Sequence, residues 1–470
     1  MLIPQPQPHR TRTWTQAAMC LACVAIASTT ASGQCDLELP VPGDVGAGAY
    51  FGTAVAMDGD LLAVGAPLDT GNDWASGVVY VFRRAADGWI NEGRLRASDG
   101  EVGDMLGVSV DIRDGRIVAG AWFDDDHGSN SGAAYVFTRN DNGAWTETAK
   151  LTKPNPGPED AFGRTVAISG ERIAVGAPLD DDAGSSSGTV TTFTLTGGAW
   201  AADTVLTSPI GANGDEFGLG LDLDGSQLLV GSPWSNDGTG HADLFTADPA
   251  GTWTHEHTFN HPDPAPGEYY AFEPALGDET VALGAYLDDD GTPTGRVFIH
   301  TRNVDGDWSL QQTLRPDDST PSNERFGVAI DLDGSVMAIG ADQAGGSGAV
   351  HIYDRSGDDW TLRTILQPEG LNAEAEFGWF VDVDGDQLAV GAYGADLDGA
   401  TRGAAWVYAG MQTSCDCPGD TDGSGAIDVN DLLAVIGAWN TDNPTADVNS
   451  DGIVNVGDLL AIIAGWGGCG

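Results

Sequence analysis

The chain has 470 residues, of which 70 are Asp or Glu and 20 are Lys or Arg, so its formal net charge is -50 at neutral pH. This excess of negative charge argues against nucleic acid or an anionic membrane surface as a partner and favours cations. It also suits a solvated surface that keeps an extracellular protein soluble. The 67 glycines and the abundant Asp favour many short strands and tight turns over long helices.

The first 33 residues have the pattern of a secretory signal peptide. Arg10 and Arg12 precede an uncharged apolar run at 17–27, and small residues follow up to Gly33. The run is too short to span a bilayer, and no later run of about 18 apolar residues occurs. We therefore expect residues 1–33 to be removed on export, and a mature protein without a membrane span that is secreted, extracellular or at the cell surface.

Between residues 34 and 410 one pattern recurs seven times. Two alternating apolar runs flank a turn containing Gly, as at 162–168 and 172–178, which predicts a β-hairpin. The Gly that closes the second run lies 14 positions after the opening residue in six copies and 12 after it in one, the copy that opens at Phe272. The openers are Phe51, Leu106, Phe162, Phe217, Phe272, Phe326 and Phe377.

Each hairpin is followed by a polar loop, a third strand and a fourth strand that often opens with Trp. Four strands in about 55 residues, repeated seven times, predict an all-β, seven-bladed propeller. The seventh copy has no fourth strand after Tyr408, whereas Leu39 precedes Phe51 by the distance that fourth strands keep elsewhere. We therefore expect the N-terminal strand to complete the last blade and close the ring.

The repeats resemble the FG-GAP repeats of integrin α-subunit heads and their bacterial relatives, across roughly residues 35 to 409. Phe-Gly is followed by an intact Gly-Ala-Pro at 65–67 and 176–178 and by degraded forms elsewhere. Family members often place a calcium loop between strands one and two. Here those connections are tight turns such as Asp58-Gly59-Asp60, so integrin-type calcium sites do not carry over.

Acidic clusters occur instead in the loops between strands two and three. They lie at 124–126, 180–182 and 288–290, with thinner versions at Asp69 and 396–398. Because propeller loops gather at one face, these clusters would together form an acidic surface for Ca²⁺ or a basic partner. The alternative is that each Asp caps its own turn and stays solvated.

No residue set has a catalytic pattern. His255, His257 and His261 alternate near one strand but lack a third patterned ligand, which favours a surface strand over a metal site. The stretch 184–188 matches a nucleophile elbow in letters only, because it lies in a loop before a strand and not between a strand and a helix. We therefore expect a protein that is not an enzyme.

After Gly410 two copies of a different unit appear, at 420–431 and 447–458, each followed by an apolar stretch. Both fit a 12-position calcium loop, with oxygen ligands at positions 1, 3, 5, 9 and 12, a backbone carbonyl at position 7 and Gly at position 6. The expected Ca²⁺ ligands are Asp420, Asp422, Ser424, Ala426, Asp428 and Asp431 in the first loop, and Asp447, Asn449, Asp451, Ile453, Asn455 and Asp458 in the second.

With Asp at position 12 and one helix after each loop, residues 418–467 resemble type I dockerin repeats, which are related to the EF-hand. Dockerins bind cohesin modules and thereby attach secreted proteins to a scaffold. The pairs before the last ligand, Val429-Asn430 and Val456-Gly457, are not the hydroxyl pair common in cellulosomal members, and the helices lack the usual basic residues. We expect residues 411–470 to form a small α-helical Ca²⁺-binding domain whose partner is cohesin-like or part of the cell envelope.

Four cysteines remain after the leader: Cys35, Cys415, Cys417 and Cys469. An even number in an oxidising compartment suggests disulfides, with three possible connectivities. A bond from Cys35 to Cys415 or Cys417 would pin the ring closure, and a bond between Cys417 and Cys469 would join the ends of the tail. A peptide map of the mature protein that finds these thiols free would contradict both bonds.

Together these patterns favour a secreted, non-enzymatic binding or adhesion protein. The propeller face would bind a protein or glycan ligand, and the tail would dock the protein to a scaffold or to the cell envelope. The alternatives are a structural component of the cell surface and an accessory protein in extracellular polysaccharide degradation.

A tail of this size buries little core, so bound Ca²⁺ should supply much of its folding free energy. We predict that a chelator unfolds the tail and leaves the propeller largely intact. Scanning calorimetry of the mature protein with and without chelator tests this expectation, and a tail transition that ignores the chelator would refute it.

Overall fold

The computed structural model describes residues 35–411, 421 and 426–468, apart from gaps at 40, 72, 86–87, 278, 289–293, 317–323, 369, 397–398, 400, 428, 442, 444–445, 449–451 and 465–466. The predicted signal peptide lies outside the described residues, as do Cys415, Cys417 and Cys469. None of the described helices is long and apolar enough to cross a membrane.

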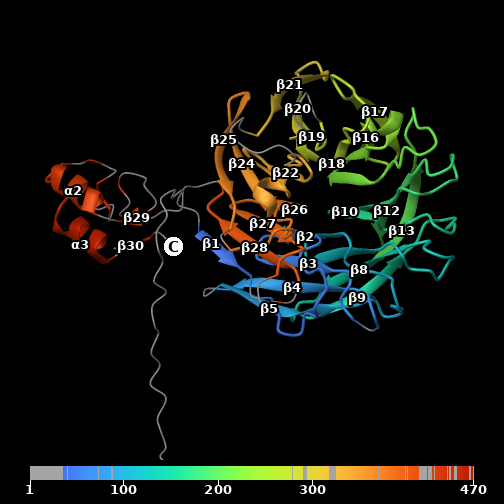
Figure 1. Cartoon of the computed structure of the whole chain (residues 1–470), viewed down its shortest axis with the longest axis horizontal. Helices are drawn as coiled ribbons and strands as arrows, with labels where there is room; N and C mark the ends of the chain where they lie inside the picture. Colours follow the sequence, from blue (N-terminus) through green and yellow to red (C-terminus); the bar gives the residue numbers. More distant parts are fainter. Residues whose placement is uncertain are drawn as a thin grey trace, which may run out of the picture.

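Seven antiparallel sheets of four strands form a ring, as the alternating apolar runs predict (Figure 1). In blades one to six the strands pair in chain order, and the first strand of each blade lies nearest the axis. Blade one comprises β2 (Val55–Asp58), β3 (Leu61–Ala66), β4 (Val78–Ala85) and β5 (Gly88–Leu95); blade two, β6 (Val110–Arg113), β7 (Arg116–Ala121), β8 (Ala133–Arg139) and β9 (Trp145–Leu151); blade three, β10 (Thr165–Ser169), β11 (Arg172–Ala177), β12 (Thr189–Thr196) and β13 (Ala199–Leu206).

The remaining blades repeat this order. Blade four comprises β14 (Gly220–Asp224), β15 (Gln227–Ser232), β16 (His241–Ala247) and β17 (Trp253–Asn260); blade five, β18 (Tyr270–Gly277), β19 (Thr280–Ala285), β20 (Arg296–Arg302) and β21 (Trp308–Leu314); blade six, β22 (Ile330–Asp333), β23 (Val336–Ala341), β24 (Ala349–Ser356) and β25 (Asp359–Leu366); blade seven, β26 (Phe380–Asp384), β27 (Gln387–Ala392), β28 (Ala404–Ala409) and β1 (Cys35–Glu38). Two one-turn helices, α1 (Ser235–Gly238) and η1 (Ala344–Gly346), lie in loops of blades four and six.

The N-terminal strand closes the ring, which confirms the prediction. Strand β1 is the outermost strand of blade seven and pairs with β28, with Cys35 opposite Ala409 and Glu38 opposite Trp406. The pairing continues beyond the strand, because the Leu39 N–H donates to the Ala405 carbonyl at 3.2 Å and the Leu39 side chain is fully buried. The two ends of the propeller segment therefore share one sheet.

The opener of the fifth copy is Tyr270, so the assignment to Phe272 is wrong. Tyr270 is fully buried, like the other six openers, and it lies 14 residues before Gly284, the spacing that all the other copies have. Ala271 follows it with φ of 66°, where the other copies have Gly with positive φ. Tyr270 and Phe272 are two residues apart, so their side chains lie on the same face of a strand. The aromatic pattern alone therefore does not distinguish them.

Neighbouring blades come into backbone contact at the glycines of the motif. A Cβ on Gly391, which ends the second run of blade seven, would lie 2.1 Å from the carbonyl oxygen of Gly52 in blade one. The opener fills the space beside this contact: Phe162, for example, packs with Val118 of blade two and Val175 of blade three. Glycine is thus required wherever one blade touches the backbone of the next.

The tail contains two helices, α2 (Val429–Gly437) and α3 (Val456–Ala464), each of which begins within the last three positions of one of the predicted loops. They pack through Val435 and Ile462, and a short pairing of β29 (Ala426–Ile427) with β30 (Gly467–Gly468) joins the start and end of the module. The structure shows two small helices, and the calcium-loop domain stays a prediction.

Substitution of Gly391 by Ala should destabilise the propeller by about 1–3 kcal/mol, because the added methyl group forces two blades apart at the ring closure. Gly46→Ala is the matched control, since an added Cβ at Gly46 meets no atom within 4 Å. Chemical denaturation of both variants measures the difference. Equal stability of the two variants would contradict the proposed contact between blades.

Candidate binding sites

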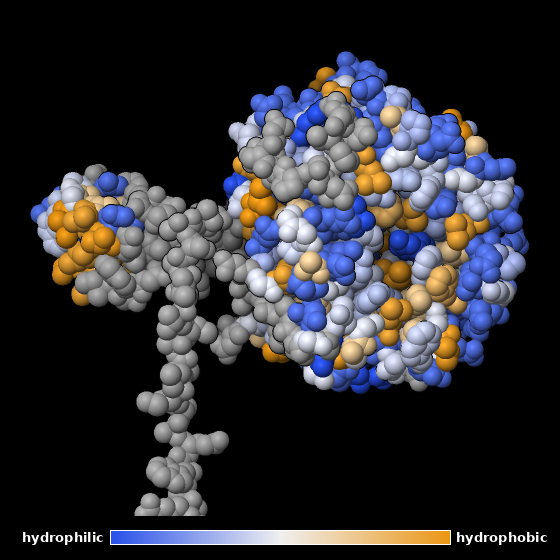
Figure 2. All heavy atoms as spheres, in the orientation of Figure 1, coloured by the Kyte–Doolittle hydropathy of each residue, from blue (hydrophilic) through white to orange (hydrophobic). Residues whose placement is uncertain are grey.

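The propeller has two chemically different faces. The loops between second and third strands and the connections to the next blade lie together on what we call the loop face, and the turns after the first and third strands lie on the turn face. Figure 2 shows that the ring is hollowed at its centre. The two ends of the axis are lined by different strand positions.

The acidic clusters of the loop face are mainly internal ion pairs. The first Asp of each main cluster is buried, and a basic side chain of the propeller contacts its carboxylate. The bases also pair with a second, exposed Asp in two of the clusters. The pairs are Asp124 with Lys150 at 2.8 Å, Asp180 with Lys153, and Asp288 with Arg296. Asp289, Asp290 and Asp398 lie outside the described residues.

Asp69, the thinner cluster in blade one, is also buried and satisfied inside the protein. It accepts a hydrogen bond from the Tyr80 hydroxyl at 2.9 Å. Asp124 and Asp180 do cap their turns, since they accept hydrogen bonds from Asp126 N and Asp182 N. The expectation that the leading Asp stays solvated is wrong, because it is buried. Their burial and their pairing with bases of the same chain also leave these leading carboxylates poor candidates for Ca²⁺.

The three histidines singled out in the sequence do not converge on one site. The His255 Nε2 lies 3.1 Å from Asp243, whereas His261 is buried with its Nε2 3.3 Å from Asp288. His261 Nδ1 accepts a hydrogen bond from the backbone N–H of Asp263 at 3.2 Å, so in the neutral ring the proton is on Nε2. In that tautomer Nε2 does not bind metal, and the ring lies beside Asp288, whose carboxylate pairs with Arg296.

A serine, a histidine and an aspartate also meet in blade four without the connectivity of a catalytic triad. The Nε2 of His241 lies 3.0 Å from the Ser208 Oγ and 3.4 Å from the Asp243 carboxylate, while its Nδ1 has no hydrogen-bond partner among the described residues. In a triad the two ring nitrogens serve different partners. The cluster therefore lacks the arrangement that activates serine.

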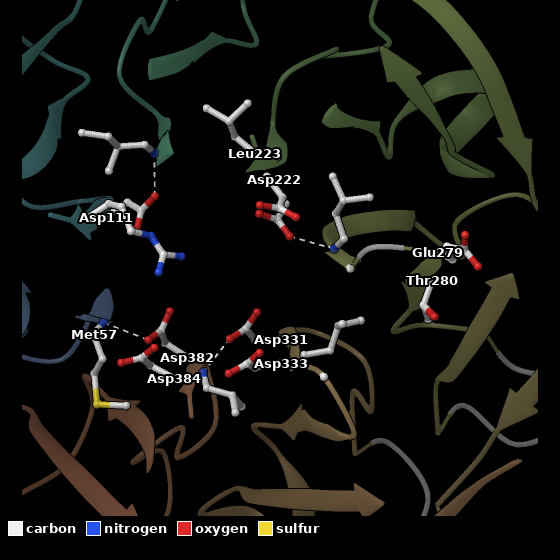
Figure 3. Close-up of a pocket in the computed structure, with 18 of the residues that line it drawn as sticks. Met57, Asp111, Asp222, Leu223, Glu279, Thr280, Asp331, Asp333, Asp382 and Asp384 are labelled. Atoms are coloured by element: carbon white, nitrogen blue, oxygen red, sulfur yellow. Dashed lines mark hydrogen bonds between the residues drawn. The ribbon is translucent and has the colours of Figure 1, made fainter. Parts of the chain in front are cut away.

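The turn-face end of the axis is a cavity of about 740 Å³ into which four aspartates project (Figure 3). Each stands five residues after the opener of its blade, on the innermost strand, and Ala stands at that position in the other three blades. The four are Asp111, Asp222, Asp331 and Asp382; the alanines are Ala56, Ala167 and Ala275.

These aspartates accept hydrogen bonds from a backbone N–H group of every blade. Asp111 accepts hydrogen bonds from Ile112 N in its own blade at 2.7 Å and from Ile168 N in the next blade at 2.6 Å. Asp222 and Asp331 bridge in the same way, to Leu223 and Leu276 and to Leu332 and Val383. Asp382 accepts from Met57 N at 2.8 Å across the closure. Four carboxylates thus bind one N–H from each of seven blades.

The aspartates are held in a recessed site and close to one another, which raises their pKa values. Burial raises the pKa of Asp111 to about 6, that of Asp331 to about 7 and that of Asp222 to about 8. Burial, followed by repulsion from Asp331 and Asp111, raises the pKa of Asp382 well above its usual range. Sequence reasoning missed this ring, although the alternation of Asp and Ala at one strand position would have shown it.

The loop-face end of the axis carries strained backbone at one position in every blade. The residue before each opener has φ between 53° and 60° and is never Gly. The left-handed region costs an ordinary residue about 1 kcal/mol or more, so the fold holds these side chains in place against strain. The seven residues are Tyr50, Met105, Ala161, Glu216, Tyr269, Arg325 and Glu376.

A continuous chain of aromatic rings crosses this end, and we call it the aromatic band. Its members stand at three repeat positions: before the opener, two after the opener, and third in Gly-Ala-Pro, with one more in the loop of blade four. Successive ring centroids lie 4.5 to 6.4 Å apart. In order, the band is Trp234, Tyr269, Tyr286, Phe272, Trp379, Tyr393 and Tyr50.

The ends of the band are open to solvent, since Trp234 is 42% exposed and Tyr50 is 38% exposed. Aromatic side chains of this kind dominate the energetic centres of binding surfaces. The sequence carried a signal for the band in the two copies where Tyr replaces Pro, at Tyr286 and Tyr393. In the sequence these substitutions resemble degraded forms of the motif, because the aromatic residues of other blades that pack beside them are distant in the chain.

Part of the predicted calcium ligand set lies among the residues of the tail that the structure describes. Asp431 and Asp458 are fully buried in the first turns of α2 and α3. The second loop folds back as the pattern requires, because Gly452 N donates to Asp447 Oδ2 at 2.8 Å and Asn455 N donates to Asp458 Oδ2 at 2.7 Å. Ala426 lies in β29, and Ile453 is exposed. Asp420, Asp422, Ser424, Asp428, Asn449 and Asp451 lie outside the described residues.

The propeller should become more stable as the pH falls from about 8.5 to about 6.5. A carboxyl whose pKa is higher in the folded than in the unfolded state binds more protons when folded, so its contribution to stability is lost as the pH rises through the folded value. His300 and His351, whose pKa values burial lowers to about 4, oppose this trend only below about pH 6.5. Thermal unfolding across this pH range measures the slope.

The variant Asp222→Asn should flatten this slope, because it removes the group with a pKa of about 8. Asp141→Asn, at an exposed turn position, is the matched control and should keep the wild-type slope. A propeller whose melting temperature is constant or rises between pH 6.5 and 8.5 would contradict the role of the aspartates.

Comparison with known families agrees with this architecture. Residues 41–82, 89–137, 145–193, 308–353 and 360–408 match the FG-GAP repeat model, and together these segments cover half of the chain. The openers of blades four and five fall between the matched segments, and in these blades Gly231-Ser232-Pro233 and Tyr270-Ala271 replace the consensus. No curated protein matches the chain. With seven blades, buried openers and inter-blade glycines in place, this chain belongs to the FG-GAP repeat family.

Proposed function

We propose that this protein is a secreted, non-enzymatic binding protein that recognises its ligand through the aromatic band and is docked to a scaffold or the cell envelope through a calcium-stabilised tail. The band is the observation that carries the proposal. It joins side chains from blades four, five, seven and one into a single surface at the end of the axis, which no one repeat could form.

Rigidity supports this function of the band. Its members project from strand ends and from strained turns that the blade contacts fix, so little conformational entropy is lost when a ligand binds. Tyr50 and Tyr269 occupy the left-handed position, and Tyr393 is further held by a hydrogen bond to Glu376. A preformed aromatic surface of this kind suits recognition better than catalysis.

The chemistry of the tail supports Ca²⁺ as its ligand. Asp431 and Asp458 are buried and accept backbone N–H hydrogen bonds from Thr421 and Asn455, and no Lys, Arg or His occurs between residues 411 and 470. The side-chain donors of the two loops are oxygen atoms, which a hard cation prefers. When bound, the cation would neutralise these carboxylates and hold the two loops folded.

The exposed face of the helices supports docking. Val429, Leu433 and Ile436 of α2 and Val456 and Leu460 of α3 are each about half exposed, and Figure 2 shows the resulting apolar patch on the tail. Exposed apolar side chains gathered in one patch on a small module favour an interaction site. Equivalent positions in the two repeats contribute to it, since Val429 and Leu433 correspond to Val456 and Leu460.

A capture experiment from the source organism's secretome tests both parts. The full mature chain is immobilised with and without Ca²⁺ and compared with Tyr50→Ala/Trp234→Ala, with Leu433→Glu/Leu460→Glu and with the control Trp74→Ala, which changes a 67% exposed ring of the loop face outside the band. We expect one set of components to depend on the band and a second set to depend on Ca²⁺ and the helix face.

Capture that is identical for all variants and independent of Ca²⁺ would contradict the proposal. Turnover of any glycan by the purified mature protein would overturn the non-enzymatic part. Melting temperatures of the variants, measured in parallel, ensure that a lost component reflects a changed surface and not an unfolded chain.

A further inference from the structure

Arg164 stands at the repeat position that faces the axis at the loop-face end. It lies two residues after the opener of blade three, the position that Phe272 and Trp379 of the aromatic band hold in blades five and seven. The ring centroids of Phe272 and Trp379 lie 6.4 Å apart although blade six separates their blades, so residues at this position converge on the axis. Arg164, Phe272 and Trp379 are each partly exposed, so a molecule from solvent can reach them.

The backbone of blade three directs Arg164 out of the sheet. The Gly163 N–H donates to the Gly176 carbonyl at 2.9 Å, and Thr165 pairs with the same Gly176. Arg164 is therefore the extra residue of a β-bulge, which re-aims a side chain away from the strand pairing. The charge of Glu273 in blade five acts on Arg164, and because blade four lies between their blades the two side chains face each other over the axis.

The positive charge of Arg164 is not neutralised by a direct partner. Among the described residues, its side chain has no ion pair and no hydrogen bond, and it contacts the ring of Trp122, whose centroid lies 5.4 Å from the guanidinium carbon. Burial lowers the pKa of Arg164, and Glu273 and Glu216 offset this effect only in part. Burial also raises the pKa of Glu273 to about 7, so at neutral pH this carboxyl is only partly ionised.

Other bases of the propeller are compensated. Against the effect of burial, nearby carboxylates raise the pKa values of Lys150, Lys153 and Arg325, whereas the pKa of Arg164 is lowered. A desolvated charge without a counter-charge is costly, and a bound anion removes that cost. Arg164 therefore has the properties of a binding group and not of a structural ion pair.

The anion that suits this position carries a single carboxylate on an apolar body. A guanidinium group presents parallel N–H donors that match the two oxygens of a carboxylate. The formal charge of -50 on the chain repels polyanions, and Glu273 and Glu216 oppose a dianion when they are ionised. Across the axis from Arg164, the rings of Phe272 and Trp379 offer an apolar surface.

We propose that the loop-face end of the axis binds an apolar monocarboxylate, an inference that rests on the proposed function of the aromatic band. The ligand's carboxylate pairs with the guanidinium of Arg164, and its apolar body packs against Phe272 and Trp379. A free small acid and the C-terminal residue of a peptide share this chemistry.

Isothermal titration calorimetry of the full mature chain tests this ligand class. The probes are phenylacetate, its neutral amide, acetate and the dianion phenylmalonate. We expect phenylacetate to bind and the other three to bind about tenfold more weakly or less, which corresponds to about 1.4 kcal/mol. An acetylated peptide that ends in phenylalanine, as the free acid and as the amide, separates the two sources. Binding of the small acid alone identifies a small molecule, binding of the peptide acid identifies a chain terminus, and either result supports the carboxylate.

Two variants should change the affinity in opposite directions. Arg164→Gln should weaken binding of the preferred acid about tenfold or more, because it removes the cation. Glu273→Gln should strengthen binding, because it removes a competing negative charge, and a purely structural role of Arg164 does not predict this gain. Arg116→Gln is the matched control: it removes the same charge at the turn face and should bind as the parent protein does. Melting temperatures within a few degrees of the parent would show that the variants fold.

The inference is overturned if none of the monocarboxylates binds, if acid and amide bind equally, or if Arg164→Gln binds the acid unchanged. Capture from the secretome that depends on Tyr50 and Trp234 but is the same for Arg164→Gln, with no monocarboxylate bound, would overturn the carboxylate and leave the proposed function in place. If the variants of Tyr50 and Trp234 also leave capture unchanged, both the inference and the proposed function fail.

Discussion

The contact of one blade's backbone with that of the next is the constraint on which the rest of the structure depends. Gly176 of blade three meets the carbonyl of Gly218 in blade four, and Gly391 meets Gly52 across the closure, at distances that leave no room for a Cβ. The Phe-Gly to Gly-Ala-Pro pattern thus follows from the packing of neighbouring blades. The aromatic band lies at positions close to the motif glycines and the opener.

The odd number of blades determines the chemistry of the opposite end. An Asp in every second blade can serve two blades, its own and the next, but seven blades leave one blade over. Blades six and seven therefore both carry Asp. Burial raises the pKa values of Asp331 and Asp382, and repulsion from neighbouring aspartates raises them further, from Asp333 and Asp111 on Asp331 and from Asp331 and Asp111 on Asp382. The cavity at the turn-face end is consequently lined by carboxylates that accept the protein's own backbone hydrogen bonds, whereas the loop-face end carries the aromatic band.

The sequence predicted the number of blades, their four strands and the closing N-terminal strand, because these follow from periodicity and from the spacing of Leu39 and Phe51. It misplaced the fifth opener, since Tyr270 and Phe272 fit the strand pattern equally well. It could not show that Asp124, Asp180 and Asp288 are buried against Lys150, Lys153 and Arg296, because those pairs join residues from 8 to 27 positions apart in the chain. The sequence did not predict the aromatic band, because its rings come into contact only when blades four, five, seven and one are arranged around the axis.

The central claim is that the ligand sits on the aromatic band at the loop face. Hydroxyl-radical footprinting of the full mature chain, with and without the captured ligand, tests it most directly, because aromatic side chains are oxidised according to their exposure. Tyr50 and Trp234 should lose reactivity when the ligand is bound, while Trp74, which is 67% exposed outside the band, should keep it. Unchanged reactivity of Tyr50 and Trp234 when the ligand is bound would contradict the account.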